Sequence, residues 1–177
     1  MEELNYNSYI QFIKEINENS KQTQKACVTT YGCQQNVSDS EIITGMLLQM
    51  GFEMCDVPAE ADVVVFNTCA VREHAELKVY GNIGALKPVK RKKPNMRIVV
   101  CGCMMQQQSV QQEIKKKYSH VNIVFGPSLI HKFPEMLFNS LSEGVKTFDR
   151  TENEVIFEDL PIKRSDNNKA WVTVMYG

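Results

Sequence analysis

The sequence lacks the features that mark membrane and exported proteins. No apolar run approaches the roughly 18 residues that a membrane helix needs. Residues 1–5, Met-Glu-Glu-Leu-Asn, have neither the cationic nor the apolar region of a signal peptide. Charge of one sign is not in excess, because 20 Lys and Arg stand against 21 Asp and Glu. We therefore expect a cytoplasmic protein with no membrane contact, in which any contact with nucleic acid comes from a local patch.

Closely paired cysteines of the CxxC type are also absent. The chain has six cysteines, and without an export signal they indicate free thiols, metal or redox chemistry rather than a disulfide framework. A structural zinc site usually takes four ligands from such pairs, so a zinc domain is disfavoured. The hydrophobic content of 43% over 177 residues is ordinary for a globular protein. This length predicts one domain with an appendage.

Apolar, strand-like runs alternate with helical patterns from residue 26 onward. We predict strands at 26–31, 52–55, 62–67, 97–101 and 121–125, and helices at about 38–50, 71–86, 108–118 and 129–141. This alternation is typical of βαβ units with right-handed crossovers. We predict an α/β fold with a doubly wound, mostly parallel five-stranded sheet, flavodoxin- or Rossmann-like, in the strand order 2-1-3-4-5.

Two segments flank this predicted domain of residues 26–142. Residues 1–25 are expected to be an N-terminal helical extension, which either packs on its own domain or binds a partner. Residues 143–177 are expected to be an extended or hairpin-like linker that leads into a new strand from Trp171, where the chain then ends.

Three cysteines follow three of the predicted strands. Cys33 follows the first strand, Cys69 the third and Cys103 the fourth. In the predicted order these strands are neighbours, and ligands bind beyond the carboxyl ends of such strands. Three thiols favour an iron–sulfur cluster or zinc with one coordination position left open. On these residues alone, a metal-free flavodoxin-like binding module with incidental thiols remains the alternative.

The other cysteines have milder interpretations. Cys27 and Cys101 lie inside predicted strands, where a thiol acts as a small buried hydrophobe. Cys55 ends the weakest strand, and we expect no chemical role for it. Within Cys101-Gly102-Cys103 we assign the site residue to Cys103, because it lies past the strand.

Three motifs in this chain resemble those of the radical-SAM methylthiotransferases. They are Thr-Tyr-Gly-Cys-Gln-Gln-Asn at 30–36 with Ser-Asp-Ser-Glu at 38–41, Asn-Thr-Cys-Ala-Val-Arg-Glu at 67–73 with Lys-Val-Tyr-Gly at 78–81, and Cys-Gly-Cys-Met-Met-Gln at 101–106. They cover the N-terminal domain of that family, here residues 26 to about 142. The resemblance implies that Cys33, Cys69 and Cys103 bind a 4Fe–4S cluster with one open iron. Met105 departs from the small residue that is usual at its position.

The first motif is most similar to one branch of that family. This branch transfers a methylthio group to C2 of N6-isopentenyl-adenosine, next to the anticodon of tRNA. The alternatives are the branches acting on threonylcarbamoyl-adenosine or on a ribosomal protein, which typically show Leu-Gly-Cys-Lys-Val-Asn or Leu-Gly-Cys-Pro-Lys-Asn.

The resemblance also has implications for what lies beyond this chain. Residues 171–177 would be the first strand of a radical-SAM barrel. A second 4Fe–4S cluster and S-adenosylmethionine would bind after Gly177, served by a reductant such as a flavodoxin. We therefore expect the present chain to be a monomer that catalyses nothing alone and has no catalytic residue of its own.

Basic residues gather before the fourth predicted strand. They are Lys87, Lys90, Arg91, Lys92, Lys93 and Arg97. Such a run attracts RNA phosphates, or it is a solvated loop whose cations favour a helix C-terminus. Its place before the strand puts it on the rim opposite the three site cysteines. The run at 115–117 is expected to be a solvated helix end.

Overall fold

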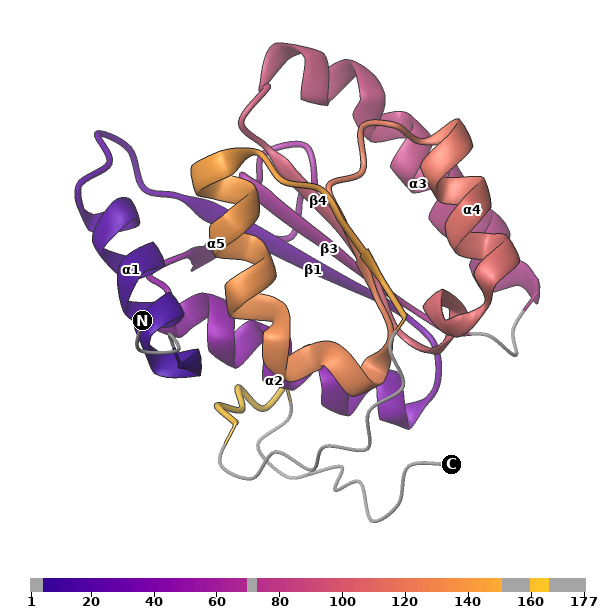
Figure 1. Cartoon of the computed structure of the whole chain (residues 1–177), viewed down its shortest axis with the longest axis horizontal. Helices are drawn as coiled ribbons and strands as arrows, with labels where there is room; N and C mark the ends of the chain where they lie inside the picture. Colours follow the sequence, from indigo (N-terminus) through magenta and orange to yellow (C-terminus); the bar gives the residue numbers. More distant parts are fainter. Residues whose placement is uncertain (1–4, 70–72, 151–159, 166–177) are drawn as a thin grey trace.

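The computed structural model describes residues 5–69, 73–150 and 160–165. Its strands form one parallel sheet in the order β2-β1-β3-β4-β5-β6 (Figure 1). The strands are β1 (Lys25–Tyr31), β2 (Glu53–Met54), β3 (Val63–Thr68), β4 (Arg97–Cys101), β5 (Ile123–Phe125) and β6 (Thr147–Asp149). The predicted α/β class and the order 2-1-3-4-5 are confirmed.

Helices cover both faces of this sheet. The helices are α1 (Tyr6–Glu18), α2 (Gln34–Gln49), α3 (Glu73–Lys92), α4 (Gln108–Lys117) and α5 (Phe133–Glu143), with the short 3-10 helices η1 (Cys103–Gln106) and η2 (Pro127–Lys132). One core lies between the sheet and α1, α2 and α5, and a second lies between the sheet and α3 and α4 (Figure 1).

The uninterrupted apolar run in β3 explains why two cores are needed. Successive side chains of a strand point to opposite faces. Val63 and Val65 therefore enter the core under α2, while Val64 and Phe66 enter the core under α3. A strand that is apolar on both faces is stable only in a sheet covered on both sides, as in doubly wound proteins.

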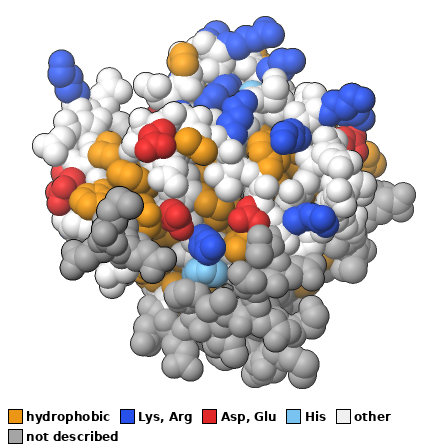
Figure 2. Space-filling model, in the orientation of Figure 1, with side chains coloured by type: hydrophobic (Ala, Val, Ile, Leu, Met, Phe, Trp, Pro, Cys, Tyr) orange, Lys and Arg blue, Asp and Glu red, His pale blue; other side chains and the backbone are white. Residues whose placement is uncertain are grey.

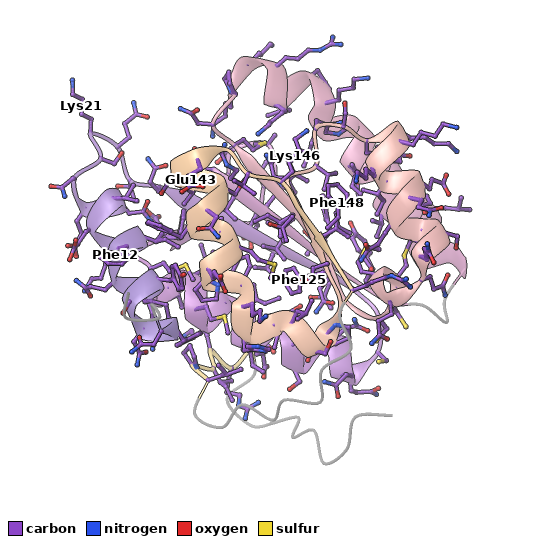
Figure 3. The ribbon with its side chains drawn as sticks, in the orientation of Figure 1. Phe12, Lys21, Phe125, Glu143, Lys146 and Phe148 are labelled. Carbon is purple, nitrogen blue, oxygen red and sulfur yellow. The ribbon has the colours of Figure 1, made fainter. Side chains whose placement is uncertain are left out.

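The sheet has one strand more than the five that the sequence predicts. The expected extended or hairpin-like segment after residue 143 instead supplies β6, which lies parallel to β5 and pairs Phe148 with Val124. Gly144 makes this possible, because its left-handed conformation (φ 69°) ends α5 and turns the chain. Figure 3 labels Phe148 and Phe125, which belong to opposite cores. Three residues are too few to show a strand period in the sequence.

The N-terminal helix packs on its own domain. The side chain of Asn5 accepts a hydrogen bond from the backbone N–H of Ser8 at 3.0 Å and caps α1. The rings of Tyr9 and Phe12 each lie 5.6 Å from the ring of Phe138 on α5. Of the two expectations for the N-terminal segment, these contacts agree with packing on its own domain. The strand expected at 171–177 lies outside the described residues. Among the helices that the structure describes, none is long and apolar enough to cross a membrane.

Candidate metal centre

The strand register brings the ends of β1, β3 and β4 to one edge of the sheet. Tyr31 pairs with Thr68, and Asn67 pairs with Cys101. Three cysteines follow these ends: Cys33 is the N-cap of α2, Cys69 comes directly after β3, and Cys103 is the first residue of η1. The structure thus brings these three cysteines, which the sequence singles out, to one rim, which we call the cysteine rim.

The thiols on the cysteine rim are close enough to affect one another. Burial raises the pKa of Cys103, and the charges of Asp39, Cys69 and Cys33 raise it further. Cys69 is buried, whereas Cys33 and Cys103 are half-buried, and all three are free thiols. The rim therefore presents three thiols from three separate loops, two of which influence the pKa of the third.

The remaining cysteines lie elsewhere. Cys101 is part of the core under α2, and burial raises its pKa well above the ordinary value. Cys27 lies four residues before the end of β1 and is buried, which also raises its pKa; a nearby Cys55 adds to this rise. Cys55 directly follows β2, and its backbone N–H donates to the carbonyl of Ala26 in β1 at 2.9 Å, which holds it near Cys27.

A buried asparagine connects two of the three cysteine loops. The Oδ1 atom of Asn36 accepts hydrogen bonds from the backbone N–H of Cys33 at 3.2 Å and from its thiol at 3.5 Å. Its Nδ2 atom donates to Oδ1 of Asn67 at 2.9 Å and to the carbonyl of Thr68 at 3.1 Å. Asn36 therefore fixes the loop of Cys33 against the end of β3, which precedes Cys69.

Asn67 and Thr68 extend this network to the third loop. Nδ2 of Asn67 donates to the carbonyl of Asn36 at 2.8 Å and to Oγ of Ser40 at 3.0 Å. The hydroxyl of Thr68 donates to the carbonyl of Cys101 at 3.0 Å. Because Asn36, Asn67 and Thr68 are fully buried, water cannot replace these bonds and the rim is held rigidly.

Glycine is required where β4 turns into η1. Gly102 has φ 101°, a conformation that other residues rarely adopt. A Cβ atom here would overlap the carbonyl oxygen of Thr68 and lie 2.5 Å from Oδ1 of Asn67. The close approach of Gly102 to the end of β3 is what places Cys103 beside Cys69.

The amides of this network were not identified from the sequence. Asn67 does carry a signal, since it ends the otherwise apolar run of β3 and a buried amide needs partners. Asn36 lies at the third position after the N-cap Cys33, where a side chain can bond back to the cap backbone. Their direct pairing across the sheet edge depends on strand order.

A carboxyl group is buried beside the rim. Asp39 is 4% exposed, and its Oδ1 atom accepts a hydrogen bond from Nε2 of Gln35 at 2.8 Å, whereas its Oδ2 atom has no hydrogen-bond partner within the described residues. Burial raises the pKa of Asp39 to about 6, although the bond from Gln35 opposes the rise. Asp39 is therefore an ionisable group whose charged form is disfavoured where it stands.

The donor set is of a kind that an iron–sulfur cluster can take. Within residues 5–69, 73–150 and 160–165, no three His, Cys, Asp or Glu side chains are grouped closely enough to hold one metal ion. The three cysteines of a cluster bind different iron atoms and so stand farther apart than the ligands of one ion. Thiols are the donors that such clusters take, and three of them lie around the rim.

Three of the six side chains of the basic run bond to the backbone of the domain. Figure 2 shows Lys and Arg side chains gathered at the top of the view, where the C-terminal end of α3 lies in Figure 1. Lys90 donates to the carbonyl of Met96, and its pKa falls to about 8, mainly through burial. Lys93 and Arg97 also bond to backbone carbonyls. The other three side chains, those of Lys87, Arg91 and Lys92, are exposed at the rim opposite the cysteines.

Comparison with known proteins adds independent information. The family described as "Uncharacterized protein family UPF0004" matches residues 25–126. A protein of Acetivibrio thermocellus named tRNA-2-methylthio-N(6)-dimethylallyladenosine synthase is 47% identical over 178 residues, which is 100% of this chain and 35% of that protein. Proteins of the same name from Clostridium perfringens (47% over 161 residues) and Alkaliphilus oremlandii (48% over 160 residues) each match 90% of this chain. The chain spans about a third of the length of these relatives.

Proposed function

This chain belongs to the methylthiotransferase family, whose N-terminal domain is described as uncharacterized protein family UPF0004, and we propose that it is the N-terminal domain of an enzyme that modifies tRNA. The substrate we propose is N6-isopentenyl-adenosine next to the anticodon, methylthiolated at C2. The names of the relatives and the Tyr-Gly-Cys-Gln form of the first motif support this choice over the threonylcarbamoyl-adenosine and ribosomal-protein branches.

The convergence of three thiols on one rim carries the proposal for this domain. We assign Cys33, Cys69 and Cys103 as the ligands of a 4Fe–4S cluster. When bound, such a cluster supplies an iron atom without a protein ligand, at which the sulfur to be transferred can attach. The loop position of the three thiols, and the influence of Cys33 and Cys69 on the pKa of Cys103, support this assignment.

The protein itself contributes a rigid and selective frame. Asn36, Asn67 and Thr68 hold the three loops at fixed separations through buried hydrogen bonds. Ligands held in place before the metal binds lose little conformational entropy on binding. Asn36 also holds the backbone of Cys33 at the start of α2, so that its thiol stays at the rim.

The resemblance assigns the cleavage of S-adenosylmethionine to another part of the enzyme, and we propose that no residue of this chain takes part in it. We propose that the second 4Fe–4S cluster and S-adenosylmethionine bind in the part of the longer relatives that this chain does not cover. A reductant such as a flavodoxin would serve that part, in a monomeric cytoplasmic enzyme. This chain by itself is then a cluster-binding domain without activity.

Anaerobic reconstitution of this chain with iron and sulfide tests the ligand assignment. We expect the wild type to bind four irons and to show a broad visible absorption band. Cys33→Ala, Cys69→Ala and Cys103→Ala should each lose most of this iron. The matched controls Cys27→Ala, Cys55→Ala and Cys101→Ala should keep it, provided that circular dichroism shows each variant to be folded.

Two results would contradict the assignment. If Cys101→Ala loses iron while Cys103→Ala retains it, the wrong thiol of the Cys-Gly-Cys pair has been chosen. If the wild type binds no iron, or binds only zinc without a visible band, the domain is a metal-free or zinc-binding module instead.

A further inference from the structure

The segment of residues 160–165, here called the strap, lies beside α2 (Figure 1), and one glutamate of that helix binds it. The backbone N–H of Lys163 donates to the carbonyl of Glu41 at 3.0 Å. The N–H and hydroxyl of Ser165 donate to Oε1 of Glu41 at 2.9 and 2.6 Å. Nη1 of Arg164 donates to Oε2 at 2.8 Å. Both carboxylate oxygens of Glu41 are therefore bonded to the strap.

The contact is buried on the side of α2. Glu41 is 4% exposed although it lies on a helix near the surface. Burial by itself raises the pKa of Glu41, but the hydrogen bonds from Ser165 and Arg164 outweigh burial, and the net direction is downward. A buried carboxylate is tolerated only when it is paired and hydrogen-bonded, and the strap supplies both kinds of partner.

A glycine one turn further along α2 makes room for the strap. A Cβ atom on Gly45 would lie 2.5 Å from the carbonyl oxygen of Pro161 and 3.0 Å from the N atom of Ile162. Glycine is a poor residue for a helix interior, so its place in the middle of α2 calls for a packing reason. Leu160, at the start of the strap, packs against the core under α2.

These contacts give the strap a direction. Pro161 lies at Gly45, whereas Lys163 and Ser165 lie at Glu41. As the chain advances, the strap therefore runs antiparallel to α2, toward the N-terminal end of that helix. Cys33 caps this end, eight residues or about 12 Å of helix from Glu41.

We propose that Glu41 and Gly45 are positioning residues that hold the strap antiparallel to α2, with Ser165 on the side of the helix end that Cys33 caps. This inference rests on the proposed function, in which the C-terminal part of the enzyme must reach the thiols of the rim. The relatives are about three times as long as this chain, so that part is large, and a fixed exit point limits the orientations in which it meets the rim.

Hydrogen exchange on this chain tests the strap without reference to function. In Glu41→Gln and in Gly45→Ala, the amides of Lys163 and Ser165, which bond to Glu41, should exchange at least tenfold faster than in the wild type. The control Gly81→Ala, at a helical glycine with open space around it, should leave them unchanged. Gly45→Ala adds only one methyl group and removes no buried charge, so it keeps the test valid if Glu41→Gln folds poorly. Unchanged exchange in both variants would overturn the anchoring.

Assays of the full-length enzyme test the positioning role. Gly45→Ala and Arg164→Ala should leave iron content and the yield of 5′-deoxyadenosine unchanged, yet lower methylthio transfer to tRNA at least tenfold. Arg164→Lys, which keeps the ion pair, should recover most of this transfer. Unchanged transfer with a freed strap would overturn the positioning role. Failure of the proposed function would show differently, as a wild-type enzyme that makes no methylthio product.

Discussion

Asn36 and Asn67 hydrogen-bond each other twice across the edge of the sheet. Nδ2 of Asn36 donates to Oδ1 of Asn67 at 2.9 Å, and Nδ2 of Asn67 donates to the carbonyl of Asn36 at 2.8 Å. One residue lies at the start of α2 and the other near the end of β3, so the pair joins the loops that carry Cys33 and Cys69. Stability and metal binding are therefore expected to depend on the same two side chains.

Removing one amide should weaken both properties. Asn36→Ala leaves Oδ1 of Asn67 and the backbone N–H of Cys33 without the side-chain partner that Asn36 supplies, and each unsatisfied group costs about 1–3 kcal/mol. We expect the free energy of unfolding to fall by about 2–4 kcal/mol in urea denaturation, with a loss of iron binding in the part that stays folded. The exposed Asn95→Ala is the control, and an Asn36→Ala protein as stable as that control would contradict the role of the pair.

A methyl group at the turn after β4 should displace Cys103. Gly102→Ala forces a positive-φ conformation that costs about 1–3 kcal/mol before any overlap with Thr68 is counted. We expect lower thermal stability and reduced iron binding. Gly81→Ala, in the exposed part of α3, should instead stabilise the domain by up to about 1 kcal/mol. Equal effects of the two substitutions would show that the close approach at Gly102 is unimportant.

The buried carboxyl of Asp39 makes stability depend on pH. Its pKa is raised from 3.8 to about 6, so the folded state favours the protonated form. The associated stability is present in full below pH 3.8 and is lost as the pH rises through about 6.

Asp39→Asn removes this ionisation. At pH 8 it should stabilise the metal-free domain by up to about 3 kcal/mol, at 1.36 kcal/mol per pKa unit, and near pH 4 the gain should vanish. Unfolding in urea at both pH values measures it, with the exposed Asp56→Asn as control. A gain that is the same at both pH values would show that ionisation is not its cause.

Two adjacent lysines at the end of α3 should differ in their effects. Nζ of Lys93 donates to the carbonyls of Glu60 and Ala61 at 2.9 and 3.2 Å and lies 3.1 Å from the carboxylate of Asp62. Lys93→Ala should therefore destabilise the domain by about 1–2 kcal/mol. Lys92→Ala, at an exposed position, should change stability by less than about 0.5 kcal/mol. Similar melting temperatures for both variants would contradict a structural role for Lys93.

Cys33→Ala should separate two activities of the full-length enzyme. Under the proposed function, the groups that cleave S-adenosylmethionine lie outside this chain, so 5′-deoxyadenosine should still form. Methylthio transfer should fail, because the rim has lost a ligand. Nucleoside analysis of digested tRNA measures the transfer, and Cys55→Ala is the control. Normal 2-methylthio product from Cys33→Ala would remove the rim from the reaction.

The apolar pattern of the strands and the position of three cysteines just after strand ends made much of the fold and of the candidate site predictable from the sequence. The run Val63-Val64-Val65-Phe66 is apolar on both faces, which requires a covered parallel sheet. The βα alternation predicted the parallel sheet, and the flavodoxin-like order expected for it put Cys33, Cys69 and Cys103 on one rim. These patterns are local and repeat along the chain. They determine where strands and helices form, and the right-handed βαβ crossovers then arrange them.

Contacts between distant segments were decided only by the tertiary structure. β6 is too short to show a period, and it forms because β5 offers it a free edge. Asn36 and Asn67 are 31 positions apart in the sequence. Glu41 lies more than 120 positions before Arg164 and Ser165, the strap residues that it binds. Buried polar groups take whichever partners the packed chain brings within reach, and a sequence states the need for a partner without stating which residue will meet it.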